Sequence, residues 1–174
     1  MIIPLEELQE EYPNVSAYKL TRKIKAIESA IRAYTNNNFN NRSIRYTLPS
    51  SAGVLNGTCA YLKCGDVVEI AYGINKGFYS VKESIEGSVT LDRALLESEE
   101  NVVTLVEYPD DVVECAWNMM EYDINQRTKA GIQSETISRH SVTYFSQDSG
   151  SFANGFPTNI LGALKPYRKV RCCK

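Results

Sequence analysis

The spacing of apolar positions predicts two helices in the first forty residues. Residues 4–12 favour a short helix that Pro13 ends, because a proline ring clashes with the preceding turn. Ser16 can cap a second helix running to about Asn37. Its apolar positions, three or four residues apart, form the stripe of an amphipathic helix: Leu20, Ile24, Ile27, Ile31 and Tyr34. The opposite face carries bases: Lys19, Arg22, Lys23, Lys25 and Arg32.

Between residues 42 and 107 the apolar period becomes two. Short β-branched or aromatic runs occur at 43–48, 66–72, 78–81, 88–91 and 102–106, separated by glycine-containing or charged turns. Strands at this spacing predict a small antiparallel barrel or meander.

A helical period returns after Pro109. The fixed φ of this proline and the charges of Asp110 and Asp111 suit a helix start. The expected buried face, on a helix ending near Lys129, comprises Val112, Val113, Ala116, Trp117, Met120 and Ile124. Further on, we expect an extended segment at 138–145, a flexible loop at 146–157, and one helical turn at 159–164 that ends before Pro166.

These patterns predict an α+β fold: a helical bundle with an inserted small antiparallel β-barrel or meander and an extended C-terminal arm. The helical core is expected at 1–41 and 108–137, and the inserted β domain at 42–107. Residues 138–174 are expected to form an extended arm with a flexible loop and a basic tail. A chain of 174 residues suits one domain, or one core with one insertion.

The net charge of −2 hides an uneven distribution. Residues 83–114 hold ten acids and one base, whereas residues 124–174 hold eight bases and two acids. Such a polarised chain can pair with copies of itself or with a charged partner. The alternative is a solvated acidic insertion and a frayed basic tail. The overall balance argues against a protein that coats nucleic acid or binds membranes through basic residues.

The sequence contains no recognisable catalytic, cofactor or metal motif. Glycine loops for phosphate and a nucleophile elbow are absent, and the single histidine excludes any site with two imidazoles. The cysteines lack zinc spacing. We therefore expect no enzyme activity, no cofactor and no metal. No signal peptide or long apolar run is visible, so we expect no membrane span and free thiols in a reducing compartment.

Five short motifs follow one another between residues 109 and 171. They are Pro-Asp-Asp-Val at 109–112, Lys-Ala-Gly-Ile-Gln-Ser-Glu at 129–135, Ile-Ser-Arg-His-Ser-Val-Thr-Tyr at 137–144, the segment 159–164, and Lys-Pro-Tyr-Arg-Lys at 165–169. This order resembles the small head–tail connector (adaptor) proteins of long-tailed bacteriophages and prophages. The resemblance covers about 1–40 and 108–171. The β insertion departs from the smallest members, which are nearly all helical.

The resemblance implies a structural subunit of a ring under the portal, which joins the capsid to the neck or tail and continues the DNA channel. Implied partners are the portal protein, copies of the chain in a ring, a further neck or tail-completion protein, and DNA that passes without sequence-specific binding; no membrane is involved. The implied location is the virion neck, after assembly in the host bacterial cytoplasm. The expected partner interface comprises Arg139, His140, Val142, Tyr144, Lys165, Tyr167, Arg168, Lys169 and Arg171.

The tail is the segment for which residue chemistry and resemblance agree. Because Pro166 disfavours helix at Lys165, we expect the tail to be extended, to contribute little to the core, and to anchor on an acidic partner through Tyr167. A second class of function, nucleic-acid binding through the same basic tail, stays open, although only Tyr167 offers a ring for stacking. A third, a hydrolase using His140, lacks a supporting constellation of residues.

Overall fold

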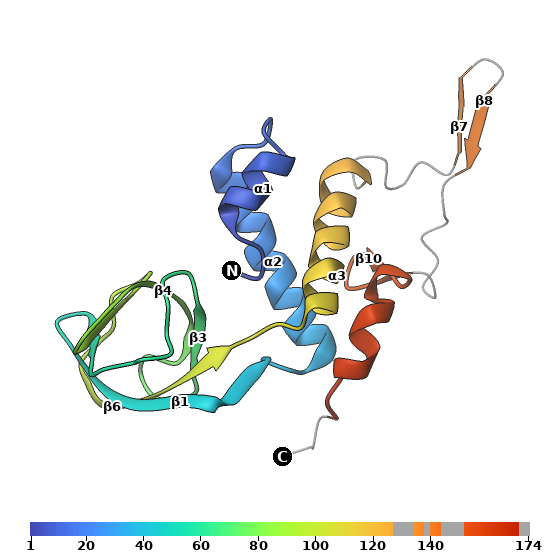
Figure 1. The fold of residues 1–174 in the computed structure, drawn as a ribbon. Helices are drawn as coiled ribbons and strands as arrows, with labels where there is room; N and C mark the ends of the chain where they lie inside the picture. Colours follow the sequence, from blue (N-terminus) through green and yellow to red (C-terminus); the bar gives the residue numbers. More distant parts are fainter. Residues whose placement is uncertain (127–133, 138–139, 144–151, 171–174) are drawn as a thin grey trace. The chain divides into compact units, whose positions relative to one another are not determined.

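The computed structural model describes residues 1–126, 134–137, 140–143 and 152–170. The chain forms two compact units, and the α+β class is confirmed (Figure 1). One unit comprises Asn38–Tyr108 together with Met1. The other comprises Ile2–Asn37 and Pro109–Lys174, so the first unit is an insertion in the second.

The helical unit begins with α1 (Leu5–Glu11) and α2 (Ala17–Thr35), which pack against each other. The predicted stripe of α2 is buried except at Tyr34, which is half-buried. Helix α2 ends at Asn36, which adopts the left-handed conformation (φ 50°) and donates its backbone N–H to the carbonyl of Arg32. Asparagine tolerates this conformation better than most residues, which explains the stop.

The third helix, α3 (Asp110–Glu121), begins after Pro109 as predicted and continues as the π-helical turn η1 (Tyr122–Gln126). Its predicted apolar face needs correction, because Trp117 and Val113 are only half-buried. Helix α3 packs against both α2 and η3 (Ile160–Tyr167), a 3₁₀ helix. The prediction is confirmed for Val112, Ala116 and Met120, and the buried stripe also includes Cys115 and Met119, which were not predicted.

Two short hairpins complete this unit. Strands β7 (Ser134–Ile137) and β8 (His140–Thr143) pair antiparallel, as do β9 (Phe152–Ala153) and β10 (Phe156–Pro157). The second hairpin occupies the end of the segment that we expected to be a flexible loop. That expectation is wrong for residues 152–157, because Phe156 is buried with its ring 6.1 Å from that of Tyr122.

The inserted unit is a closed antiparallel barrel, so the barrel alternative of the prediction is confirmed and the meander is wrong. Its strands are arranged in the order β1-β2-β5-β4-β3-β6. Their bounds are Asn40–Ser51 for β1, Val54–Asn56 for β2, Val67–Ile70 for β3, Gly77–Ile85 for β4, Ser88–Leu91 for β5 and Ser98–Val106 for β6. The pairing of β1 with β6 closes the barrel, which removes exposed strand edges.

The barrel interior is filled by the alternate residues that the period of two predicts. The fully buried members include Leu55, Val68, Ile70, Val89 and Val103. The chain enters at Asn40 and leaves at Val106, which pair with each other at the same end of the barrel. The opposite end, called here the distal end, is formed by the β1–β2, β3–β4 and β5–β6 connections.

The asparagine-rich segment at 36–41 makes specific side-chain contacts. Within the barrel unit, Asn38 and Asn40 donate to the two carboxylate oxygens of the buried Glu69, at 2.9 and 2.6 Å. The bonds from Asn38 and Asn40 satisfy the Glu69 carboxylate, which would otherwise be costly to bury. The two chain segments that connect the units are also hydrogen-bonded to each other, because the backbone N–H of Glu107 donates to the carbonyl of Phe39 at 2.9 Å.

Candidate partner interface

The structure describes only part of the interface that the sequence predicts. Arg139, Tyr144 and Arg171 lie outside the described residues. His140 and Val142 lie in β8, where their backbones pair with Ile137 and Glu135 of β7. The four remaining residues lie together in η3 and just beyond it: Lys165, Tyr167, Arg168 and Lys169.

The predicted extended tail is wrong for Lys165–Tyr167, which belong to η3. Leu161 and Leu164 of this helix are buried and η3 packs against α3. The Sγ of Cys115 on α3 also donates to the carbonyl of Ile160 at 3.3 Å. Burying two leucines offsets the local cost of Pro166, which cannot donate a backbone hydrogen bond and disfavours helix at the residue before it.

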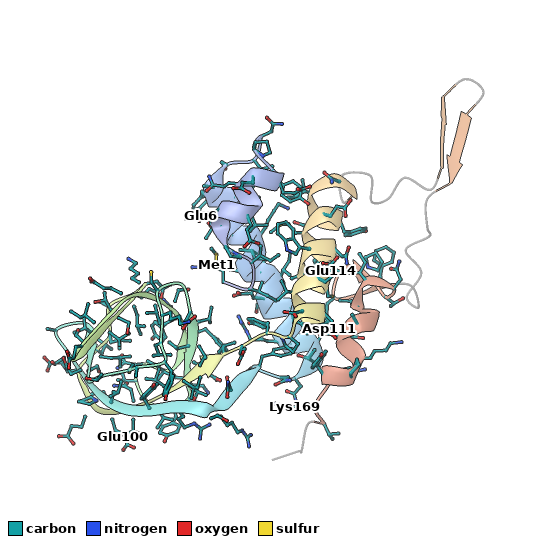
Figure 2. The ribbon with its side chains drawn as sticks, in the orientation of Figure 1. Met1, Glu6, Glu100, Asp111, Glu114 and Lys169 are labelled. Carbon is teal, nitrogen blue, oxygen red and sulfur yellow. The ribbon has the colours of Figure 1, made fainter. Side chains whose placement is uncertain are left out.

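Tyr167 is bound to its own chain. Its hydroxyl donates to the Asp111 carboxylate, with distances of 2.8 and 2.9 Å to the two oxygens. Figure 2 shows Asp111 on α3 and Lys169 just beyond η3. The hydrogen bond to Asp111 is the main cause that raises the pKa of the Tyr167 phenol above 10.0, followed by desolvation and the charge of the carboxylate. The side chain that we expected to anchor a partner therefore fastens η3 to α3.

The backbone beyond η3 is held at the C-terminal end of α2. The N–H of Lys169 donates to the carbonyl of Thr35 at 2.8 Å. The Nδ2 of Asn37 donates to the carbonyl of Tyr167, and that of Asn36 to the carbonyl of Lys169, both at 3.4 Å. Helix ends leave carbonyls unsatisfied, so these contacts serve both segments. The pair Asn36-Asn37 signalled only a helix stop in the sequence, and nothing local indicated its distant partners.

The basic side chains of this segment have different environments. The guanidinium carbon of Arg168 lies 5.2 Å from the ring centroid of Tyr34, within the range of a cation–π contact. The side chains of Lys165 and Lys169 are exposed, as is Val170. The segment Lys165–Val170, seated at the end of α2, thus exposes two ammonium groups, the guanidinium of Arg168 and one apolar side chain, which suits recognition of an acidic surface.

The described residues offer little for other kinds of chemistry. Among them, no group of three or more His, Cys, Asp or Glu side chains is placed to hold a metal ion. Burial raises the pKa of the Cys115 thiol to about 11, with a further contribution from Asp111, so this cysteine is a poor nucleophile at neutral pH. No helix in the described ranges is long and apolar enough to cross a membrane.

No model of a known protein family matches the chain, and no curated protein matches it either.

Proposed function

We propose that this chain is a structural head–tail connector (adaptor) subunit, which forms a ring under the portal of a long-tailed phage or prophage. In this role it joins the capsid to the neck or tail and continues the DNA channel, with a helical bundle as its frame. The protein acts by binding partners and catalyses no reaction. Its location is the virion neck, after assembly in the bacterial cytoplasm.

The observation that carries the proposal is the way the segments of the resemblance come together. The motifs at 109–112 and 159–169 lie far from residues 2–37 in the sequence, yet all of them fall in one compact unit. Within this unit η3 packs on both α2 and α3. The Lys-Pro-Tyr-Arg-Lys motif at 165–169 is an integrated part of that unit, and the barrel is inserted in the sequence between the two halves of the unit.

The seated C-terminal segment favours protein docking over nucleic-acid binding. The Tyr167 hydroxyl is bound to Asp111 and Arg168 lies over Tyr34, so neither side chain can reach out to an unpaired base without breaking these contacts. The two exposed lysines can still complement acidic groups of the portal. Such charges contribute orientation and association rate more than affinity, so further contacts in the ring are required.

The experiment is co-sedimentation of the purified chain with assembled portal, followed by negative-stain imaging. We expect rings stacked coaxially on the portal. The variant Lys165→Glu/Lys169→Glu should weaken binding about tenfold or more, because opposed like charges cost a few kcal/mol. The matched control Lys63→Glu/Lys82→Glu reverses two exposed lysines of the barrel and should bind like wild type. Absence of wild-type binding overturns the proposal, and a salt-dependent gel shift with DNA would then favour the nucleic-acid alternative.

A further inference from the structure

The distal end of the barrel exposes three large apolar side chains. Tyr72 and Ile74 lie in the β3–β4 connection and Leu96 lies in the β5–β6 connection, with exposed fractions of 56%, 67% and 58%. Scattered exposed apolar residues need no explanation, but these belong to two loops that contact each other at one end of a small domain. A grouping of this kind indicates a surface that binds another protein.

A buried polar network holds the two loops together. The side chain of Asn75, the residue after Ile74, is buried. Its Nδ2 donates to the carbonyl of Leu96 at 2.8 Å, and its Oδ1 accepts from the backbone N–H of Leu96 at 2.8 Å. It also donates to Oδ1 of the buried Asn101 at 3.0 Å. Ile74 and Leu96 are therefore displayed from one rigid support. Little conformational entropy remains to be lost on binding, which favours their use as contact residues.

Acidic side chains follow directly after this apolar group. Glu97, Glu99 and Glu100 are all exposed, and Figure 2 shows Glu100 projecting outward from the barrel. Two bases occupy the same loops. Arg93 donates to the carbonyl of Phe78 at 2.6 Å and lies 4.5 Å from the ring centroid of Tyr79, and both Arg93 and Lys76 are exposed outside β6. The side of the distal end formed by β6 is thus acidic.

The outer face of α2 has the complementary chemistry. Tyr18 is 77% exposed, and Lys19, Arg22 and Lys25 are exposed beside it. Residues 18, 22 and 25 share one face of the helix, because they are separated by four and three positions. An aromatic ring flanked by bases therefore matches apolar side chains flanked by acids in the sign of the charge.

We infer that the distal end of the barrel docks on the outer face of α2 of a second copy of this chain. The two surfaces are different, so each docked copy leaves one surface of each kind open, and repetition gives a closed ring or a filament. The inference rests on the proposed function in that it supplies the contact between ring neighbours. One loop end and one helix face make a small interface, so the contact is weak in solution and weakens further with salt.

Photo-cross-linking tests which surfaces meet. Benzoylphenylalanine in place of Ile74 should give a cross-linked dimer at high protein concentration, and mass spectrometry should place the link within residues 17–29. The matched control carries the same group in place of Ile85, which is also exposed, at 56% against 67% for Ile74, but lies at the other end of the barrel. The Ile85 variant should give about tenfold less dimer. A link from position 74 to any other region, or equal yields at both positions, overturns the inference.

A charge exchange tests the complementarity independently. In the chain with benzoylphenylalanine at position 74, Glu99→Lys/Glu100→Lys should lower the dimer yield about tenfold, and so should Lys19→Glu/Arg22→Glu. An equimolar mixture of the two variants should restore the yield, because each reversed surface then meets its complement. Failure of the mixture to restore dimer overturns the inference. Restoration by Lys165→Glu/Lys169→Glu instead of the α2 variant also overturns it, since the C-terminal segment would then be the partner.

Portal co-sedimentation separates this contact from the proposed function. If the chain binds portal while the cross-links and exchanges fail, the contact is wrong and the connector proposal stands. If the cross-links and exchanges succeed while portal binding fails, the chain assembles with itself through this contact but is not a connector.

Discussion

Replacing Leu164 by alanine tests whether the C-terminal segment is part of the fold. Leu164 is completely buried in η3, which packs on α3. The substitution removes three carbon atoms worth about 0.8 kcal/mol each, and the remaining cavity raises the cost to about 3–4 kcal/mol. With a urea m-value of about 2 kcal/mol/M, the unfolding midpoint of the helical unit should fall by about 1.5–2 M.

The single tryptophan makes this measurement specific to one unit. Trp117 lies half-buried on α3, so its fluorescence reports unfolding of the helical unit even if the barrel unfolds separately. The control is Lys165→Ala at the exposed neighbouring position, which should change stability by less than about 0.5 kcal/mol. Equal midpoints for the two variants would refute the packing of η3 on α3 and restore the prediction of a tail that contributes little to the core.

Three further outcomes follow from the described contacts. Asn75→Ala leaves its buried polar partners unsatisfied, which should cost about 2 kcal/mol of local stability. Amide hydrogen exchange in residues 95–101 should therefore become about thirtyfold faster, and an unchanged exchange rate would contradict the network. At pH 8, iodoacetamide should modify the exposed Cys64 well before the buried Cys115, as followed by peptide mass spectrometry; equal rates would contradict the burial. The raised pKa of Tyr167 means that its stabilising contribution is complete below pH 10 and is lost as the pH rises through the folded-state pKa. The free energy of unfolding measured in urea should therefore fall less between pH 8 and pH 11 in Tyr167→Phe than in the wild type. An equal fall in the two proteins would contradict the bond to Asp111.

Features set by local periodicity could be predicted from the sequence. The stripe from Leu20 to Ile31 follows from helical spacing, and the barrel follows from alternation in strands such as Ser98–Val106. Pro109 and the two acids after it mark the start of α3 correctly. Strand β2 escaped prediction because its three residues, Val54–Asn56, are too few to show a period.

Features set by long-range contacts could not be predicted. Pro166 carries a strong local preference against helix, but the burial of Leu164 and the bond between Tyr167 and Asp111 outweigh it. The prediction that Trp117 is buried was wrong for a related reason, since the packing of η3 on α3 decides which side chains of α3 are buried. Asn75 looked like an ordinary turn residue between strands, and only the closed barrel brings Asn101 within its reach.

The packing of η3 also decides which variants can test a partner role for the C-terminal segment. Replacement of Tyr167 breaks its bond to Asp111, so a loss of portal binding could reflect damage to the helical unit rather than a lost contact. Deletion of residues 165–174 has the same defect, because it removes the bond from the Lys169 backbone to Thr35. Charge reversal at Lys165 and Lys169 avoids this problem, since both side chains are exposed and the bond to Thr35 uses only the main chain. If docking depends on the outward charge of the segment Lys165–Val170, these two reversals should weaken portal binding about tenfold or more at unchanged stability. A tail that must detach before it binds would instead bind better after Tyr167→Phe.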